Sequence, residues 1–192
     1  MLKAVVAAVA AKGYGSTTIA DITRGARVSR DTFYQQFASK EECFLAAYDT
    51  ITEALIDEIV AVGTSQADYV DGMRDGVRVY LNFWREHPEA ARVCALDVLA
   101  VGEQGLAHRE QTLASMARLF RGIAERAARE QSGLPELPAV VPRAIVVASV
   151  ELTTEYVRQG RTASLPDVED DMLYLWLMGI AGHEVAAAAM RG

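Results

Sequence analysis

Residues 17–40 read TTIADITRGARVSRDTFYQQFASK, the pattern of two short helices joined by a tight turn and followed by the start of a third. Thr17 or Thr18 can cap the first helix, because a threonine hydroxyl accepts a hydrogen bond from a free backbone N–H at a helix start. Gly25 is expected to end that helix, since glycine readily adopts the left-handed conformation found at helix C-termini. Ser29 can cap the second helix. The stretch therefore predicts a compact unit of short helices.

The second helix of this unit has one apolar side and one polar side. Phe33 and Phe37 are four residues apart, so both are expected to point into a core. On the other side, Arg30 and Gln35 suit a DNA surface, because arginine and glutamine can form paired hydrogen bonds to guanine and adenine edges, and hydroxyl groups can bond to phosphates. The full set of candidate DNA-contacting residues is Thr17, Thr18, Ser29, Arg30, Thr32, Tyr34, Gln35 and Lys40.

The charge of the chain is distributed unevenly. Its net charge is −7, which by itself argues against a nucleic-acid partner. Residues 1–40, however, hold six basic and two acidic side chains, and all three lysines lie there. A basic segment on an acidic protein supplies local attraction to phosphates. The residue pattern alone leaves a second interpretation open, in which the polar side is the solvated face of an ordinary three-helix unit.

The first fifty residues also resemble the DNA-binding domain of the tetracycline-repressor (TetR) family of bacterial regulators. The segments that carry the resemblance are KGYGSTTIADI, GARVSRDTFYQQF and SKEECFLAAYD. The resemblance implies that the candidate side chains lie at or near DNA. Two positions depart from the family: Gln35 stands where histidine is frequent, and Asp31 stands where a small residue is frequent. The family also has an arginine-containing turn ahead of residues 1–14, so phosphate contacts from such an arm are not expected here.

Beyond this unit the sequence is expected to be helical throughout, because apolar residues recur at helical spacing and prolines are few. Glycine and proline divide the chain into helices at about residues 40–62, 67–86, 88–101, 104–130, 141–159 and 167–190, with the clearest loop at 132–142. We therefore expect an all-α fold of about nine helices. Its expected domains are a three-helix helix-turn-helix DNA-binding domain at residues 1–48 and a helical effector-binding and dimerisation domain at residues 49–192.

The last expected helix is apolar nearly all round, so it must be buried. One of its stripes contains Leu173, Leu177, Ile180 and Val185, and a second stripe contains Met172, Trp176, Gly179, Gly182 and Ala186. The segment VELTTEYVRQGRTASLPDVEDDMLYLWLMGIAG, residues 150–182, resembles the C-terminal half of some TetR regulators. In that family the last two helices pair with those of a second subunit, which implies a homodimer here. The alternative is a central helix in a monomeric bundle.

Large apolar side chains and a few hydroxyl groups recur in the middle helices, a combination that suits a pocket for a hydrophobic or aromatic ligand. The TetR resemblance supports an effector pocket in this region without naming its residues. For each side chain taken alone, ordinary core packing is the commoner explanation. The candidate ligand-binding residues are Tyr69, Met73, Tyr80, Phe83, Trp84, Met116, Phe120, Thr153 and Tyr156.

Several classes of protein have no support in the sequence. There is no apolar run of the roughly 18 residues that a membrane-spanning helix needs, so we expect a cytoplasmic protein without a membrane partner. Cys43 and Cys94 lack the spacing of a metal or redox site, and the three histidines are isolated. Neither a metal, a cofactor nor catalysis is therefore expected.

Together these observations predict a ligand-responsive transcriptional repressor. It would bind a palindromic operator on double-stranded DNA as a dimer. A small hydrophobic or aromatic effector would release it. The alternative is a helical small-molecule-binding or protein-interaction dimer that has lost sequence-specific DNA binding, which Asp31 and the short first helix favour.

Overall fold

The structure is a computed structural model that describes residues 1–66, 68–131, 134 and 137–191. Within these residues it consists of ten α-helices and two short 3-10 helices and has no strand, so the all-α class is confirmed with one α-helix more than expected. In chain order the elements are α1 (Leu2–Lys12), α2 (Ile19–Ala26), α3 (Arg30–Tyr34), α4 (Lys40–Ser65), α5 (Tyr69–Glu86), α6 (Pro88–Ala95), η1 (Asp97–Val101), α7 (Glu103–Glu130), α8 (Val140–Arg158), η2 (Thr162–Val168), α9 (Glu169–Ala181) and α10 (His183–Ala189).

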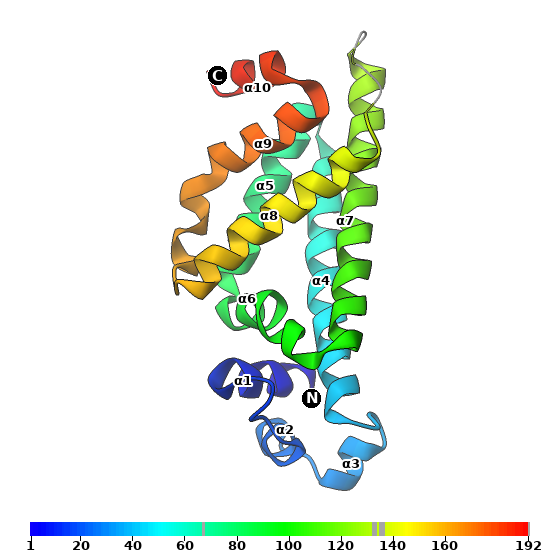
Figure 1. Cartoon of the computed structure of the whole chain (residues 1–192), viewed down its shortest axis with the longest axis vertical. Coiled ribbons are helices and arrows are strands. Elements are labelled where there is room, and N and C mark those ends of the chain that lie inside the picture. Colours follow the sequence, from blue (N-terminus) through cyan, green and yellow to red (C-terminus); the bar gives the residue numbers. More distant parts are fainter. Residues whose placement is uncertain (67, 132–133, 135–136, 192) are drawn as a thin grey trace.

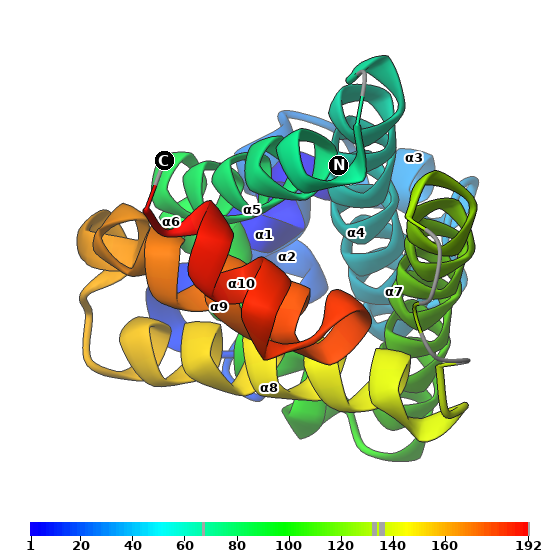
Figure 2. The same cartoon turned by 90° about the horizontal axis from the view of Figure 1, so that it is seen from above.

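The molecule is elongated, with α1, α2 and α3 at one end and α10 at the other (Figure 1). The long helix α4 starts near α3 and runs up the molecule in contact with α5 and α7. Seen from above, α8, α9 and α10 lie together on one side and α4 and α7 on another (Figure 2). None of the described helices is both long enough and apolar enough to cross a membrane.

Two glycines act differently from the sequence expectation. Gly25 does not end α2 but lies inside it, and a Cβ there would be 3.3 Å from the Cβ of Ala4, so the glycine lets α1 and α2 pack closely. The left-handed residue that follows α2 is Arg27, with φ of 55°. Conversely, the expected helix at residues 167–190 is interrupted at Gly182, whose φ of 88° separates α9 from α10.

Two further boundaries differ from expectation. The expected helix at residues 88–101 is divided into α6 and η1. Of the expected loop at residues 132–142, residues 132–133 and 135–136 lie outside the described part of the chain, and Val140 already begins α8. Pro142 sits in the first turn of α8, where its missing N–H costs no helical hydrogen bond.

Buried apolar side chains form two clusters. The first, called here the N-terminal core, contains Val5, Val9, Ile22, Phe33, Cys43, Phe44, Leu45, Ala47, Tyr48, Val93 and Val98. The second, called here the body core, contains buried residues of α4 to α10. Val93 of α6 and Val98 of η1 are fully buried in the N-terminal core, so the later part of the chain completes the packing of the first three helices.

The second stripe of the last expected helix packs within one chain. Met172 is fully buried and Trp176 is 3% exposed. A Cβ on Gly179 would lie only 2.7 Å from Cδ1 of Ile145, so this glycine lets α9 approach α8 closely. Met172, Trp176 and Gly179 of this stripe therefore belong to the packing within one chain. The exposed apolar side chains of α8 and α9 are instead Val140, Val147 and Met178.

The crossing of α4 and α5 depends on a glycine pair, which a substitution can test. A Cβ on Gly72 would lie 2.8 Å from the carbonyl oxygen of Gly63, and both groups belong to backbone that cannot turn aside. Gly72→Ala is therefore expected to lower the free energy of unfolding by about 1–3 kcal/mol, measured by urea denaturation.

Gly122 provides the matched control for that substitution. It lies on α7, and a Cβ there would meet nothing within 4 Å. Gly122→Ala should stabilise the protein by about 0.5–1 kcal/mol, because alanine has the higher helix propensity. Equal effects of the two substitutions would show that the α4–α5 crossing does not need its glycine.

Candidate nucleic-acid interface and ligand cavity

Side-chain caps hold both helix starts of the helix-turn-helix unit. Thr18 Oγ1 accepts a hydrogen bond from the Asp21 N–H at 3.3 Å, and the Asp21 carboxylate accepts one from the Thr18 N–H at 2.8 Å, which is a reciprocal capping box. Ser29 Oγ accepts a hydrogen bond from the Thr32 N–H at 3.0 Å at the start of α3. Thr18 and Ser29 therefore set where α2 and α3 begin.

The short helix α3 combines a buried aromatic anchor with a polar outer surface. Phe33 is fully buried, whereas Tyr34 is 47% exposed. Arg30 and Gln35 are exposed and Thr32 is half-buried. Arg30 Nη2 donates a hydrogen bond to Tyr34 Oη at 3.4 Å, and the guanidinium carbon lies 5.8 Å from the tyrosine ring centroid. The structure thus leaves most of the predicted set on α3 available to a partner.

Two residues of the predicted set face inward. Thr17 is 2% exposed, and its hydroxyl donates hydrogen bonds to the carbonyls of Gly13 at 2.9 Å and Ala8 at 3.3 Å. Lys40 Nζ donates hydrogen bonds to the carbonyls of Tyr14 at 2.8 Å and Thr17 at 3.0 Å. These bonds correct the expectation that both side chains are free for phosphates, because they hold the segment between α1 and α2 in place.

Two basic side chains near the turn were not singled out from the sequence. Arg24 lies in the last turn of α2 with 79% of its side chain exposed, and Arg27 is exposed at the C-terminus of that helix. No motif marks them, and the positive charge of residues 1–40 was the only signal that could have found them.

Asp21 makes the stability of this unit sensitive to acid. Hydrogen bonds from Lys12 Nζ, at 2.5 Å, and from Thr18 hold the pKa of the Asp21 carboxyl well below its usual range. A depressed pKa stabilises the folded state at pH values above the unfolded pKa of about 3.9, and this contribution is lost as the pH falls towards the folded pKa.

We therefore expect the thermal midpoints of the native protein and of Asp21→Asn to converge as the pH is lowered. They should differ most above about pH 5 and approach each other towards about pH 2. Lys12→Met should reduce the gap at neutral pH, because it removes the strongest partner of the carboxylate. A difference in thermal midpoint that does not change with pH would show that the negative charge of Asp21 does not contribute to stability.

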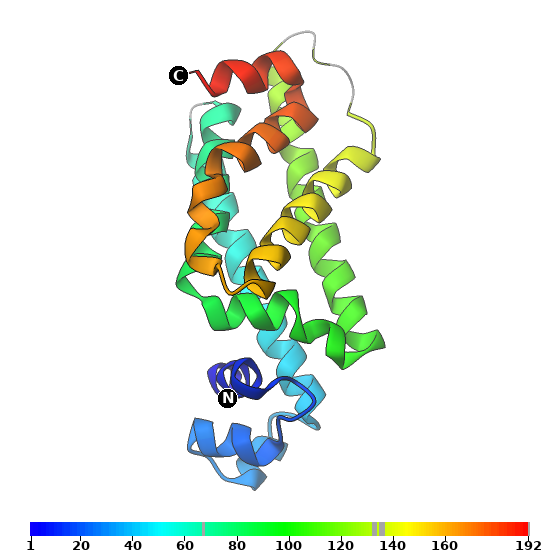
Figure 3. The same cartoon turned by 60° about the vertical axis from the view of Figure 1, so that its left-hand side comes forward.

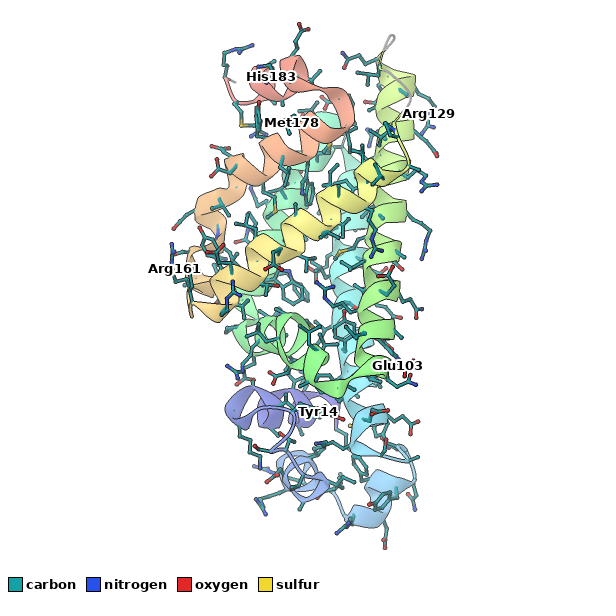
Figure 4. The ribbon with its side chains drawn as sticks, in the orientation of Figure 1. Tyr14, Glu103, Arg129, Arg161, Met178 and His183 are labelled. Carbon is teal, nitrogen blue, oxygen red and sulfur yellow. The ribbon has the colours of Figure 1, made fainter. Side chains whose placement is uncertain are left out.

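A buried carboxylate links the N-terminal helices to the body. The Tyr14 N–H donates a hydrogen bond to Asp97 Oδ1 of η1 at 3.2 Å, and Asp97 is 7% exposed. Arg92 Nε of α6 lies 3.4 Å from Asp97 Oδ2. Tyr14 lies at the junction of the N-terminal helices and the body (Figure 4). Through this hydrogen bond, a movement of α6 and η1 would therefore shift the segment between α1 and α2.

Three cavities inside the body share lining residues and follow one another. The inner chamber has a volume of about 50 Å³ and is lined by Tyr80, Trp84, Arg109, Thr112, Met116 and Thr153, among others. The neck, of about 20 Å³, shares Tyr80 and Met116 with the inner chamber. The outer pocket, of about 330 Å³, shares Ile59, Leu119, Ile123 and Trp176 with the neck. The row is lined by residues of α4, α5, α6, α7, α8 and α9, and Figure 3 shows how these helices are arranged.

Most of the predicted ligand-binding residues line this row. Their places are Tyr80, Trp84, Met116 and Thr153 in the inner chamber, Phe120 in the neck, and Tyr69 and Met73 in the outer pocket. Phe83 and Tyr156 line none of these three cavities. Phe83 instead packs edge-on against Trp84, and the Tyr156 ring lies 4.8 Å from the Arg161 guanidinium.

The polar groups of the cavity walls are mostly bonded to each other. The hydroxyls of Tyr80 and Thr153 are 2.9 Å apart, and Trp176 Nε1 donates a hydrogen bond to Ser149 Oγ at 2.9 Å. Burial raises the pKa of Tyr80 to about 12, so its hydroxyl stays neutral. Sequence reasoning missed the polar lining residues Tyr48, Thr52, Arg109 and Thr112, because their position depends on how α4 and α7 are aligned.

Neither thiol has the surroundings of a reactive cysteine. Burial raises the pKa of the Cys43 thiol to about 11 and that of Cys94 still further. Both thiols are therefore protonated at neutral pH and are poor nucleophiles. Among the residues that the structure describes, no three His, Cys, Asp or Glu side chains are grouped so that they could hold a metal ion.

Comparison with known proteins adds to this geometry. Residues 2–47 match the model of bacterial regulatory proteins of the tetR family. The HTH-type transcriptional regulator EthR of Mycolicibacterium smegmatis is 26% identical over 185 residues, which cover 89% of this chain and 80% of that protein.

Two solved structures have the same fold over nearly the whole chain. The fatty acid degradation regulator FadR of Bacillus halodurans has a TM-score of 0.85 at 18% identity, with 94% of each chain covered. FadR of Bacillus subtilis in complex with stearoyl-CoA has a TM-score of 0.82 at 17% identity, covering 93% of this chain and 97% of that one. The chain therefore carries the N-terminal segment that the tetR family model describes, followed by a helical body with the fold of these regulators.

Proposed function

We propose that the protein is a ligand-responsive repressor that acts in the cytoplasm. It binds a palindromic operator as a homodimer and is released by a hydrophobic effector. The observation that carries the proposal is that one structure combines the exposed polar surface of α3 with a row of cavities in the body, joined through α4, α6 and the Tyr14–Asp97 hydrogen bond.

The proposed DNA contacts come from α3 and the residues around it. Arg30 and Gln35 are exposed and have the side chains that read guanine and adenine edges in the major groove. Ser29, Thr32, Tyr34 and Thr18 are proposed to bond to phosphates, which fix the position of the helix on the duplex. The exposed Arg24 and Arg27 add attraction to the backbone.

The proposed effector carries a long apolar group. The walls of the neck and much of the wall of the outer pocket are apolar. Because these cavities follow one another, together they suit a long apolar group better than a compact one. The solved FadR structure that holds stearoyl-CoA supports an acyl chain as the class of ligand. An effector that binds one arrangement of α4 and α6 better than another would shift the spacing of the two α3 helices and lower the affinity for the operator.

The proposed subunit contact is the outer surface of α8 and α9. Val147 is 40% exposed and Met178 is 44% exposed on these neighbouring helices, and Figure 4 shows Met178 on α9. Exposed apolar side chains on adjacent helices suit a contact between two copies. We further propose that residues 1–48 act as the DNA-binding domain and residues 49–192 as the effector-binding and dimerisation domain.

The first test is selection from a random duplex library at moderate salt, followed by sequencing of the retained DNA. An enriched inverted repeat is expected, because twofold dimers read two half-sites about one or more helical turns apart. Stearoyl-CoA and free stearate are then titrated separately into the complex while the anisotropy of a labelled operator is followed. Release at micromolar concentrations supports the proposal. Enrichment of a single unrepeated site would argue against a dimeric reader.

One observation favours a second candidate, a ligand-binding dimer without sequence-specific DNA binding. Asp31 is exposed on α3, one residue after Arg30, and its negative charge opposes close approach to phosphates. This candidate predicts no enrichment from the library for the native protein. The variant Asp31→Ala distinguishes the two, since recovery of DNA binding in that variant alone would identify the charge as the cause.

A further inference from the structure

The inner chamber contains a buried hydrogen-bond donor without an acceptor. Trp84 is 6% exposed, and its indole Nε1 makes no hydrogen bond within the described residues. The indole interacts with the Tyr80 hydroxyl closely enough to lower the pKa of that group against the effect of burial, but the contact does not reach hydrogen-bonding geometry, and the Tyr80 and Thr153 hydroxyls are 2.9 Å apart. Leaving a buried N–H unsatisfied costs about 1–3 kcal/mol, so the donor calls for a partner that the chain does not supply.

The other tryptophan shows what a satisfied indole looks like in the same protein. Trp176 is 3% exposed, and its Nε1 donates to Ser149 Oγ at 2.9 Å. Both tryptophans line the row of cavities, Trp84 at the inner chamber and Trp176 at the neck and outer pocket. The unsatisfied donor is therefore a particular property of the inner chamber.

A positive charge lies at the same chamber. Arg109 of α7 lines it, and its charge adds to the Arg143 hydrogen bond in lowering the pKa of the neighbouring Glu110. The neighbouring carboxylate of Asp49 is bonded to His108 Nδ1 at 2.8 Å. Both charges act at the chamber wall: burial raises the pKa of the Tyr48 hydroxyl to about 12, the Arg109 charge lowers it and the Asp49 charge raises it.

We infer that the inner chamber binds the carboxylate of an apolar acid. One carboxylate oxygen accepts a hydrogen bond from Trp84 Nε1, and the Arg109 guanidinium supplies the opposite charge. The volume of about 50 Å³ exceeds the roughly 10–15 Å³ that a single water needs, so it suits a small polar group and is too small for a whole alkyl chain. This inference rests on the proposed function, because it names the chemistry of the effector.

The apolar part of the acid has a path out of the chamber. The neck begins at Tyr80 and Met116 and is lined further by Leu119 and Phe120, and it leads to the larger outer pocket. Methionine is flexible and adapts to irregular shapes, so Met116 can move aside to widen the neck. A linear chain then fills the row with its acid group in the inner chamber.

Calorimetric titration of the full-length protein without DNA tests the inference, with decanoate, decanamide and 1-decanol as ligands. Decanoate is expected to bind about ten- to a hundredfold more tightly than decanol, the usual size of a hydrogen bond to a charged group. Decanamide, which keeps the acceptor oxygen but lacks the charge, should lie between them. Equal affinities of the three, or no binding of decanoate, would overturn the inference.

Two variants assign the preference to the named groups. Trp84→Phe keeps an aromatic ring but removes the N–H, and Arg109→Met removes the charge while keeping a long side chain. Each should cut the preference for decanoate over decanol about tenfold or more. Trp176→Phe is the matched control and should leave that preference unchanged, because its N–H is already bonded within the protein. A preference that survives in both Trp84→Phe and Arg109→Met would refute the assignment.

Thermal unfolding shows whether a variant loses ligand preference because it is less stable. Because Trp84 Nε1 has no partner, Trp84→Phe should lower the thermal midpoint less than Trp176→Phe does. Arg109→Met changes a half-buried residue and provides a second route if the tryptophan variant is unstable.

If decanoate binds as expected but does not release the operator, the proposed function fails while the inference holds. If decanol releases the operator as well as decanoate does, the inference fails while the proposed function holds.

Discussion

Phe33→Ala is expected to lower the free energy of unfolding of the N-terminal helices by about 3–5 kcal/mol. Phe33 is fully buried, and its ring centroid lies 5.5 Å from that of Tyr34 and 5.8 Å from that of Phe37. The N-terminal core is small, so the cavity left by one phenylalanine removes a large share of its packing. Native-state hydrogen exchange of α2 and α3 amides measures the loss locally, and operator affinity should fall with it.

Leu106→Ala is the control for this prediction. Leu106 is also a large apolar residue, but it is 54% exposed on α7. Its replacement should change stability by no more than about 0.5 kcal/mol, as is usual for exposed positions. If exchange in α2 and α3 accelerates as much in Leu106→Ala as in Phe33→Ala, then Phe33 is not the anchor of α3.

The double variant Arg30→Ala, Gln35→Ala is expected to lose about 1–3 kcal/mol of operator affinity for each base contact removed. It should also accept substituted operators more readily, because base-edge hydrogen bonds carry the sequence preference. Fluorescence anisotropy with the selected operator and with variants at each position measures both effects. The variant should remain folded, since both side chains are exposed and neither belongs to the N-terminal core.

Arg143→Ala serves as the charge-matched control for Arg30. Arg143 forms paired hydrogen bonds of 2.6 Å with Glu110 and belongs to α8, a helix that Figure 1 shows well away from α3. Its removal should leave operator affinity unchanged. A similar loss in both proteins would mean that affinity responds to net charge alone, and unchanged affinity in the double variant would remove Arg30 and Gln35 from the interface.

The helix-turn-helix unit was predictable from its sequence because its signals are local. A capping residue and a buried aromatic residue act within one or two turns of chain, and Ser29 and Phe33 lie where the pattern placed them. The choice between Thr17 and Thr18 was not predictable. It depends on the carbonyls of Ala8 and Gly13, which the fold of α1 brings to Thr17.

The ligand cavity shows a different limit of sequence reasoning. Helical spacing identifies Tyr80 and Trp84 as neighbours on α5, and both do line the inner chamber. Helical spacing cannot predict that Arg109 lines the same chamber, because the position of Arg109 depends on how far α7 is shifted along α4. It also cannot separate Phe83, which packs beside Trp84, from the residues that line the chamber. Contacts between helices therefore decide the site.

The short helix α6 contributes both to the ligand cavity and to the N-terminal core. Ala91, Cys94 and Ala95 line the inner chamber, whereas Val93, between them in the sequence, is buried in the N-terminal core. Successive side chains on a helix point in different directions, so neighbouring positions in the sequence contact different parts of the protein. Adaptation to a new effector through Ala91 or Ala95 is therefore expected to alter operator affinity as a side effect. Effector specificity and operator affinity would then evolve together, because a few residues of one short helix are under selection for both.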